Sequence, residues 1–171
     1  MKIVLYYFQF LIIRIIFFIL KILPLNFSKK LSSTIFRIVG KLTSADKTAI
    51  NNCKFVFPNL EHNKIREIID KSWDNIGKTI CELLRFEEML NKNIIIIKGL
   101  NNIKNLKNNN QAIFISIHQS NWEVLVPMLE RIGLNIGGIY RHINNFFLDK
   151  LVLKIRKKSL ISNNNFYTPK G

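Results

Sequence analysis

One histidine and one carboxylate stand five residues apart in the segment SIHQSNWE, residues 116–123. An imidazole has an ordinary pKa of about 6.5, so it can accept the proton of an attacking hydroxyl near neutral pH. A carboxylate close to the ring can fix its tautomer and stabilise the imidazolium that forms. His118 and Glu123 are therefore candidates for general acid–base chemistry, with His118 as the base.

The local backbone decides whether these two side chains can meet. On a regular helix five residues correspond to about 500 degrees of rotation, so His118 and Glu123 would lie on different faces. The apolar run AIFISI at 112–117 predicts a buried strand, which puts His118 at a strand end, where ligand sites gather in open α/β sheets. Ser120 and Glu123 also match a helix capping box, and Asn121 is a second possible cap. The residues leave the catalytic and capping interpretations both open.

The elements around this segment predict an α/β fold. Helical spacing of apolar residues runs from Ser28 to Phe86, with a break at Pro58 and Asn59. Further along, strands are expected at 94–97, 112–117 and 135–140, and helices at about 100–107, 121–131 and 145–158. We expect an N-terminal membrane helix and a helical region, followed by a mixed or mostly parallel sheet with flanking helices.

The N-terminal segment is apolar enough to attach the chain to a membrane. Residues 3–20 are interrupted only by Gln9 and Arg14 and are long enough to span a hydrocarbon core. No small-residue cleavage site follows, which favours an uncleaved anchor over residues 1–25, with the remaining domain over 26–171. Arg14 and Lys21 lie seven residues apart on one helical stripe, so a helix lying in the membrane interface is equally consistent. The cations that follow the segment indicate a cytoplasmic domain.

The net charge limits the classes of partner to consider. The chain has 26 Lys and Arg against 11 acidic residues, a net charge of +15, which suits nucleic acid, anionic lipid or an acidic protein. Its basic residues are dispersed and no nucleic-acid-binding motif appears, so a nucleic acid partner is not expected. The basic residues at 150–158 suit an acidic carrier protein or an anionic membrane, and equally an ordinary solvated helix face. Cys53 and Cys81 lack metal or redox spacing and are expected to be buried thiols.

The segment HQSNWE at 118–123 resembles the His-x4-Asp/Glu motif of glycerolipid-type acyltransferases. Its form is similar to the His-x-x-Asn-Trp-Glu version of the bacterial lipid A biosynthesis (lauroyl) acyltransferases. Three flanking features match that family in the same order, namely NNCKFVFPNL at 51–60, KGL at 98–100, and Tyr-Arg at 140–141 with residues 145–149 after it. The resemblance covers nearly the whole chain.

The resemblance implies a reaction and a site. His118 would be the general base on a hydroxyl of a lipid A precursor, and Glu123 its orienting partner. Asn121 and Arg141 would bind substrate, the latter by pairing its planar guanidinium with a phosphate. The acyl donor would be an acyl carrier protein thioester, commonly carrying laurate. The family implies no metal and no organic cofactor, and a place on the cytoplasmic face of the bacterial inner membrane.

Members of the resembled family continue beyond the point at which this sequence ends, so we expect a C-terminally truncated chain with an incomplete acyltransferase fold. An inactive fragment or a non-enzymatic membrane-associated protein is one alternative. A glycerolipid or lysophospholipid acyltransferase is another, although Ile117 before the histidine and Glu123 in place of aspartate favour the lipid A branch.

Overall fold

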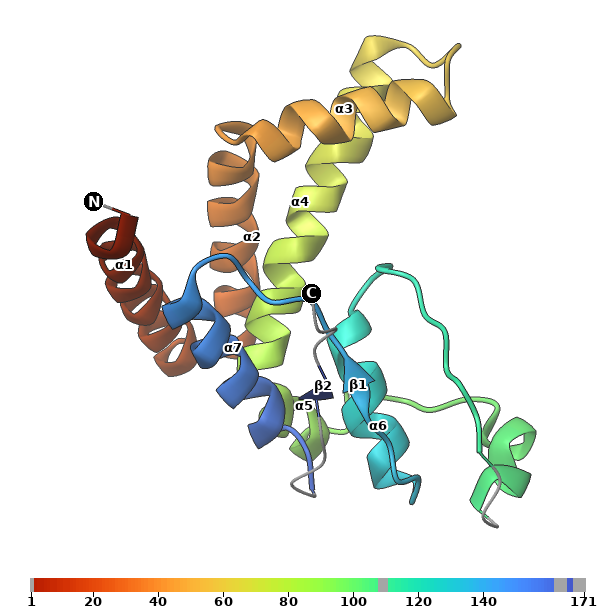
Figure 1. Cartoon of the computed structure of the whole chain (residues 1–171). Coiled ribbons are helices and arrows are strands. Elements are labelled where there is room, and N and C mark those ends of the chain that lie inside the picture. Colours follow the sequence, from red (N-terminus) through yellow and green to blue (C-terminus); the bar gives the residue numbers. More distant parts are fainter. Residues whose placement is uncertain (1, 108–110, 162–165, 168–171) are drawn as a thin grey trace.

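Helices dominate the computed structural model of the chain (Figure 1). The structure describes residues 2–107, 111–161 and 166–167. In chain order its elements are α1 (Lys2–Ile22), α2 (Leu25–Lys41), α3 (Ser44–Val56), α4 (His62–Leu84), α5 (Phe86–Asn91), the 3-10 helices η1 (Leu100–Lys107) and η2 (Trp122–Val124), α6 (Leu125–Arg131), β1 (Gly138–Ile139), α7 (Phe146–Lys158) and β2 (Phe166–Tyr167).

The predicted α/β fold is wrong. In the described part of the chain the only strands are β1 and β2, which have two residues each and pair in parallel, Gly138 with Phe166 and Ile139 with Tyr167. No strand forms at 94–97 or 112–117. The predicted helices between 28 and 86, near 121–131 and at 145–158 are confirmed. The predicted break at Pro58 and Asn59, between α3 and α4, is confirmed as well.

The apolar run at 112–117 shows why the sheet fails. A strand is stable when its backbone N–H and C=O groups pair with a neighbour and one face is covered. Here the run is extended but unpaired, and Ile113 and Ile115 are 91% and 92% exposed. A cavity separates this run from residues 134–139, the next apolar stretch along the chain. The sequence correctly predicted an extended segment at 112–117, but the prediction that this segment is a buried strand was wrong.

The helices α2, α3 and α4 form the scaffold on which the rest is built. Ile65 and Ile69 on α4 pack with Cys53 of α3 in a buried cluster, and Trp73 packs against its edge. Trp73 also donates from its ring Nε1 to Asp46 at 2.7 Å. Burial of these apolar side chains provides the non-directional part of the stability. The sequence correctly predicted Cys53 and Cys81 to be buried.

The α2–α4 contact is close because α4 has a glycine where the helices meet. The Ser32 hydroxyl donates to the backbone carbonyl of Gly77 at 2.7 Å. A Cβ atom at position 77 would lie 2.7 Å from both the Ser32 carbonyl oxygen and the Ser33 Cα. The atoms it would meet belong to backbone, so they cannot yield by a side-chain rotation. Gly77 therefore sets the separation of α2 and α4.

We predict that Gly77→Ala destabilises the protein. Alanine gains about 1 kcal/mol of helix propensity over glycine, but inserting a methyl group into a tightly packed contact costs about 1–3 kcal/mol. Thermal unfolding in detergent, followed by helical circular dichroism, should show a lower midpoint. Lys71→Ala on the same helix is the matched control, because that side chain is 75% exposed. A Gly77→Ala midpoint equal to or above that of the unmodified chain would contradict this account of the contact.

Candidate active site

His118 lies at the end of the extended segment and opens onto the surface. The chain turns directly after it, with the Gln119 N–H donating to the Ile117 carbonyl at 2.8 Å and Ser120 in the left-handed region at φ 52°. The imidazole is exposed and meets the Trp122 ring edge-to-face at 4.9 Å between ring centroids. A strand end was predicted for His118, and the structure provides the end of an extended, unpaired segment.

Helix α4 holds this turn through polar side chains. The amide of Asn75 and the hydroxyl of Thr79 donate to the Ser120 carbonyl at 3.0 and 3.3 Å. One residue further, the Asn121 amide donates to a carboxylate oxygen of Glu82 at 2.6 Å. These three hydrogen bonds fix the backbone that follows His118, so the position of the imidazole depends on α4.

The capping question left open by the sequence is decided in favour of Asn121. Its side-chain oxygen accepts from the Glu123 backbone N–H at 3.1 Å, at the start of η2. Ser120 supplies no side-chain cap, and the Glu123 carboxylate does not turn back to form a capping box. Since Asn121 is engaged by both Glu82 and Glu123, its predicted role in substrate binding stays a prediction.

The Glu123 carboxylate pairs with Arg156 of α7. Two nearly parallel hydrogen bonds join them, from Arg156 Nε at 2.9 Å and from Nη2 at 2.6 Å. The side chains are only 9% and 22% exposed, so this ion pair is largely shielded from water. Burial opposes the charge of Arg156, but the hydrogen bonds with Glu123 and the negative charges of Glu123 and Asp149 together outweigh it and hold the guanidinium pKa above its ordinary value.

The sequence did not single out Arg156, which it grouped with the basic residues of 150–158. The sequence signal is the spacing alone, because Arg156 follows Asp149 by seven residues and so shares its face of α7. The structure shows both side chains to be largely buried on that face. Among the described residues no hydrogen bond joins His118 to Glu123. The predicted orientation of His118 by Glu123 therefore has no direct contact behind it in this arrangement.

Arg141 lies between Tyr140 and His142, whose rings extend a series of contacts that begins at Glu123. The Arg156 guanidinium is 5.8 Å from the centroid of the Tyr140 ring, and that ring is 5.4 Å from the His142 ring. Burial and the nearby Asp149 carboxylate raise the pKa of Tyr140. The side chain of Arg141 points to no partner within the described contacts and is exposed. Its predicted role in substrate binding stays a prediction.

The His142 imidazole contacts Asp149 at 2.7 Å from its Nδ1, and the Ile143 N–H donates to the other oxygen of the same carboxylate at 2.9 Å. Burial opposes the charge on Asp149, but these two interactions outweigh it and lower the carboxyl pKa. His142 and Asp149 together thus help to fix the loop before α7.

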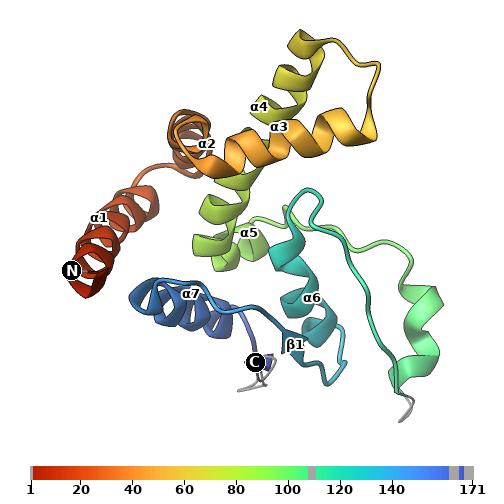
Figure 2. The ribbon, with the colours of Figure 1, turned by 45° about the horizontal axis from the view of Figure 1, so that its top comes forward.

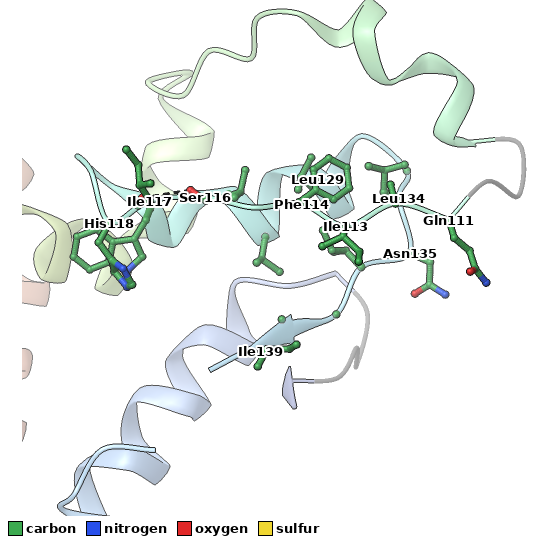
Figure 3. A pocket seen from close by; sticks show the side chains of 18 residues that line it. Gln111, Ile113, Phe114, Ser116, Ile117, His118, Leu129, Leu134, Asn135 and Ile139 are labelled. Atoms are coloured by element: carbon green, nitrogen blue, oxygen red, sulfur yellow. Dashed lines mark hydrogen bonds between the residues drawn. The ribbon is translucent and has the colours of Figure 1, made fainter. Parts of the chain in front are cut away.

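An apolar cavity of about 1110 Å³ lies beside His118 (Figure 3). Its walls come from the extended segment, α6 and residues 133–139, and in the close-up His118 lies at one end and Gln111 at the other. Ligand pockets usually measure about 300–1,000 Å³, so this one is large. Its apolar lining includes Phe114, Leu125, Val126, Leu129, Leu134 and Ile136.

Within the described ranges no three His, Cys, Asp or Glu side chains are grouped as metal ligands. The groups placed at the site are the exposed His118 imidazole beside the apolar cavity and the Glu123–Arg156 ion pair that supports the same turn. The exposed Arg141 follows the cavity-lining Ile139 by two residues.

Comparison with known proteins identifies the family. The model of the bacterial lipid A biosynthesis acyltransferase family matches residues 1–165. The chain belongs to this family. No curated protein and no solved structure matches it. Membership establishes a lipid A biosynthesis acyltransferase in general, with a lipid A substrate, and the match includes all four residues predicted for the site.

We predict that Arg156→Met in this acyltransferase destabilises the protein by about 3 kcal/mol, at the low end of the cost of breaking a buried ion pair because Arg156 keeps some exposure. The substitution leaves the Glu123 carboxylate buried without its counter-charge. Thermal unfolding in detergent measures the loss. Lys154→Met, at an exposed position of α7, is the matched control. The double variant Glu123→Gln with Arg156→Met should recover part of the stability, and equal losses in Arg156→Met and Lys154→Met would refute the role of the pair.

Proposed function

We propose that this chain transfers a fatty acyl group from an acyl carrier protein thioester to a hydroxyl of a lipid A precursor. Residues 26–171 carry the reaction and residues 1–25 attach it to the cytoplasmic face of the bacterial inner membrane. The observation that supports this most directly is the exposed His118 imidazole at one end of the apolar cavity. An acyl chain is apolar, and the cavity is lined largely by apolar side chains.

The proposed reaction begins with proton abstraction. His118 removes the proton of the acceptor hydroxyl while the oxygen attacks the thioester carbonyl carbon, forming a new carbon–oxygen bond. The tetrahedral intermediate then collapses by breaking the carbon–sulfur bond. The imidazolium returns its proton to the departing thiolate, so His118 ends neutral and the products are an ester and the free carrier thiol. Such a base contributes about 10² to 10⁴ in rate.

Glu123 and Asn121 support His118 through the backbone in this proposal. Asn121 caps η2 and holds Glu82, while Glu123 ties the same turn to α7 through Arg156. Both residues are thus positioning residues for the imidazole. A rigid support of this kind matters because small displacements of a general base from its hydroxyl lose much of the rate.

The partners fit the charge of the surface. The lysines of α7 that face solvent are Lys150, Lys154, Lys157 and Lys158. An acidic carrier protein would be attracted to such a cluster, which increases the rate of encounter. Arg141 is exposed near the site, and its fork of N–H donors suits a phosphate of the lipid A precursor.

His118→Ala should abolish acyl transfer, by at least about 10²-fold, because no other group replaces the base. Its folding stability should not change, since the imidazole is exposed. The assay uses membranes that express the full chain, acyl carrier protein loaded with laurate, and a lipid A precursor. His62→Ala, which removes another exposed histidine, is the control and should retain activity. Turnover that survives in His118→Ala, or no product from the unmodified chain present in the membranes, would refute the mechanism.

Arg141→Gln should raise the KM for a phosphorylated acceptor by about 10- to 100-fold, the equivalent of one charge-assisted hydrogen bond of about 1.5–3 kcal/mol, with a smaller effect on kcat. Steady-state kinetics with varied acceptor measures it. Lys47→Gln on α3 removes another exposed cation and should leave the KM unchanged. An acceptor that lacks its phosphates should not distinguish Arg141→Gln from the unmodified chain. Equal KM values for the two variants on the phosphorylated acceptor would exclude this role.

A further inference from the structure

Helix α1 has two different faces. On one face large apolar side chains recur every three or four residues with exposed fractions between 39% and 74%, namely Val4, Phe8, Leu11, Ile15, Phe18 and Ile22. On the other face the side chains are partly or fully buried, namely Tyr6, Phe10, Ile13, Phe17 and Leu20. By length and composition α1 could cross a membrane. Helix α1 could therefore either span the membrane or lie flat on its surface.

The N-terminal half of α1 is fastened to α7. The Asn145 amide donates to the Tyr6 backbone carbonyl at 2.9 Å and to the Gln9 side-chain oxygen at 3.1 Å. The Phe147 ring meets the Tyr7 ring edge-to-face at 5.5 Å. Gln9, a polar interruption in an apolar helix, is thus accounted for by a contact with the globular part. Both overall views show α1 and α7 as neighbours (Figures 1 and 2).

The C-terminal half of α1 is fastened as well. Leu20 is 1% exposed, and the Arg85 guanidinium at the end of α4 donates to its carbonyl at 3.2 Å. The same guanidinium also donates to the Leu23 carbonyl and, at 3.1 Å, to the Ser28 hydroxyl. Helix α1 is therefore held against the globular part at both ends and does not project away from it.

A spanning α1 conflicts with these contacts. Its 21 residues measure about 31 Å, close to the ~30 Å hydrocarbon core, so spanning would use the whole helix. The Tyr6–Gln9 turn would then lie inside the hydrocarbon, with the first turn of α7 beside it. Asp149 belongs to that first turn and Lys150 follows it directly, and charged side chains are strongly disfavoured in the hydrocarbon. An α1 that lies flat keeps these groups on the aqueous side.

We propose that α1 lies in the plane of the membrane surface, with its exposed apolar face in the lipid and the globular part above it in the cytosol. The proposal rests on the membrane attachment given under the proposed function and adds its geometry. Arg14 and Lys21 share one stripe at the edge of the exposed face, where they meet anionic headgroups. The Arg14 guanidinium lies 5.7 Å from the centroid of the Phe10 ring, so this cation lies against the helix at the edge of its exposed face.

Cysteine labelling in spheroplasts tests this geometry without any need for activity. Lys2→Cys and Arg14→Cys are made separately in the full chain, and each is treated with a membrane-impermeant maleimide before and after permeabilisation. The unmodified chain supplies the background, since Cys53 and Cys81 are buried. Lys157→Cys, exposed on α7, supplies the cytosolic reference.

A flat α1 predicts that residues 2 and 14 both stay at background in intact spheroplasts and both rise to the level of the reference after permeabilisation. Label on residue 2 in intact spheroplasts shows that the N-terminus has crossed the membrane and overturns the proposal. Protection of residue 14 after permeabilisation places it in the hydrocarbon and overturns it too, as does recovery of the chain in the soluble fraction. A failure of acyl transfer alone would leave the labelling pattern unchanged, so the two proposals fail separately.

Discussion

The turn after His118 depends on hydrogen bonds from two helices, because no sheet supports it in the described part of the chain. Helix α4 contributes three donors or acceptors to Ser120 and Asn121, and α7 contributes the guanidinium that holds Glu123. Polar contacts of this kind are directional, so they fix orientation as well as position. Ser120, Asn121 and Glu123 thus have a side chain or carbonyl committed to the support of the turn, and the imidazole of His118 is left exposed beside the cavity.

This arrangement makes the site sensitive to the packing of distant helices. Helix α4 carries Gly77 against α2 and, two and five residues later, Thr79 and Glu82 against the turn that follows His118. A change in the α2–α4 separation would therefore be felt at His118. Glu82 also pairs with Lys29 of α2, so both helices meet at the residue that holds Asn121. The packing of α2 against α4 therefore also determines the geometry of the turn that carries His118.

The sequence predicted the helices well and the sheet badly, for a physical reason. Helical periodicity reports a local property, the face that a helix buries; it correctly predicted helix through α4 and located α7 to within one residue. A strand depends on a partner that can lie anywhere in the chain, so the run at 112–117 showed apolar character but could not show whether a neighbour exists. The same limit applies to the site. Asn121 as a cap is a local matter and was among the alternatives, whereas Arg156 lies 33 residues from Glu123 and depends on where α7 packs.

The ion pairs within the chain leave an excess of cations that can act on partners outside it. Most acidic side chains in the described residues form an ion pair with a cation of the same chain. Examples are Asp46 with Arg66, Glu88 with Arg85 and Glu123 with Arg156. The excess of 26 basic over 11 acidic residues leaves 15 cations beyond any one-to-one pairing. Their field must act on something outside the chain, and both an anionic membrane surface and an acidic carrier protein have the required sign. A helix α1 lying flat on the membrane would keep the lysines of α7 close to that surface. In the proposed reaction the carrier protein that donates the acyl group would meet the acceptor lipid there.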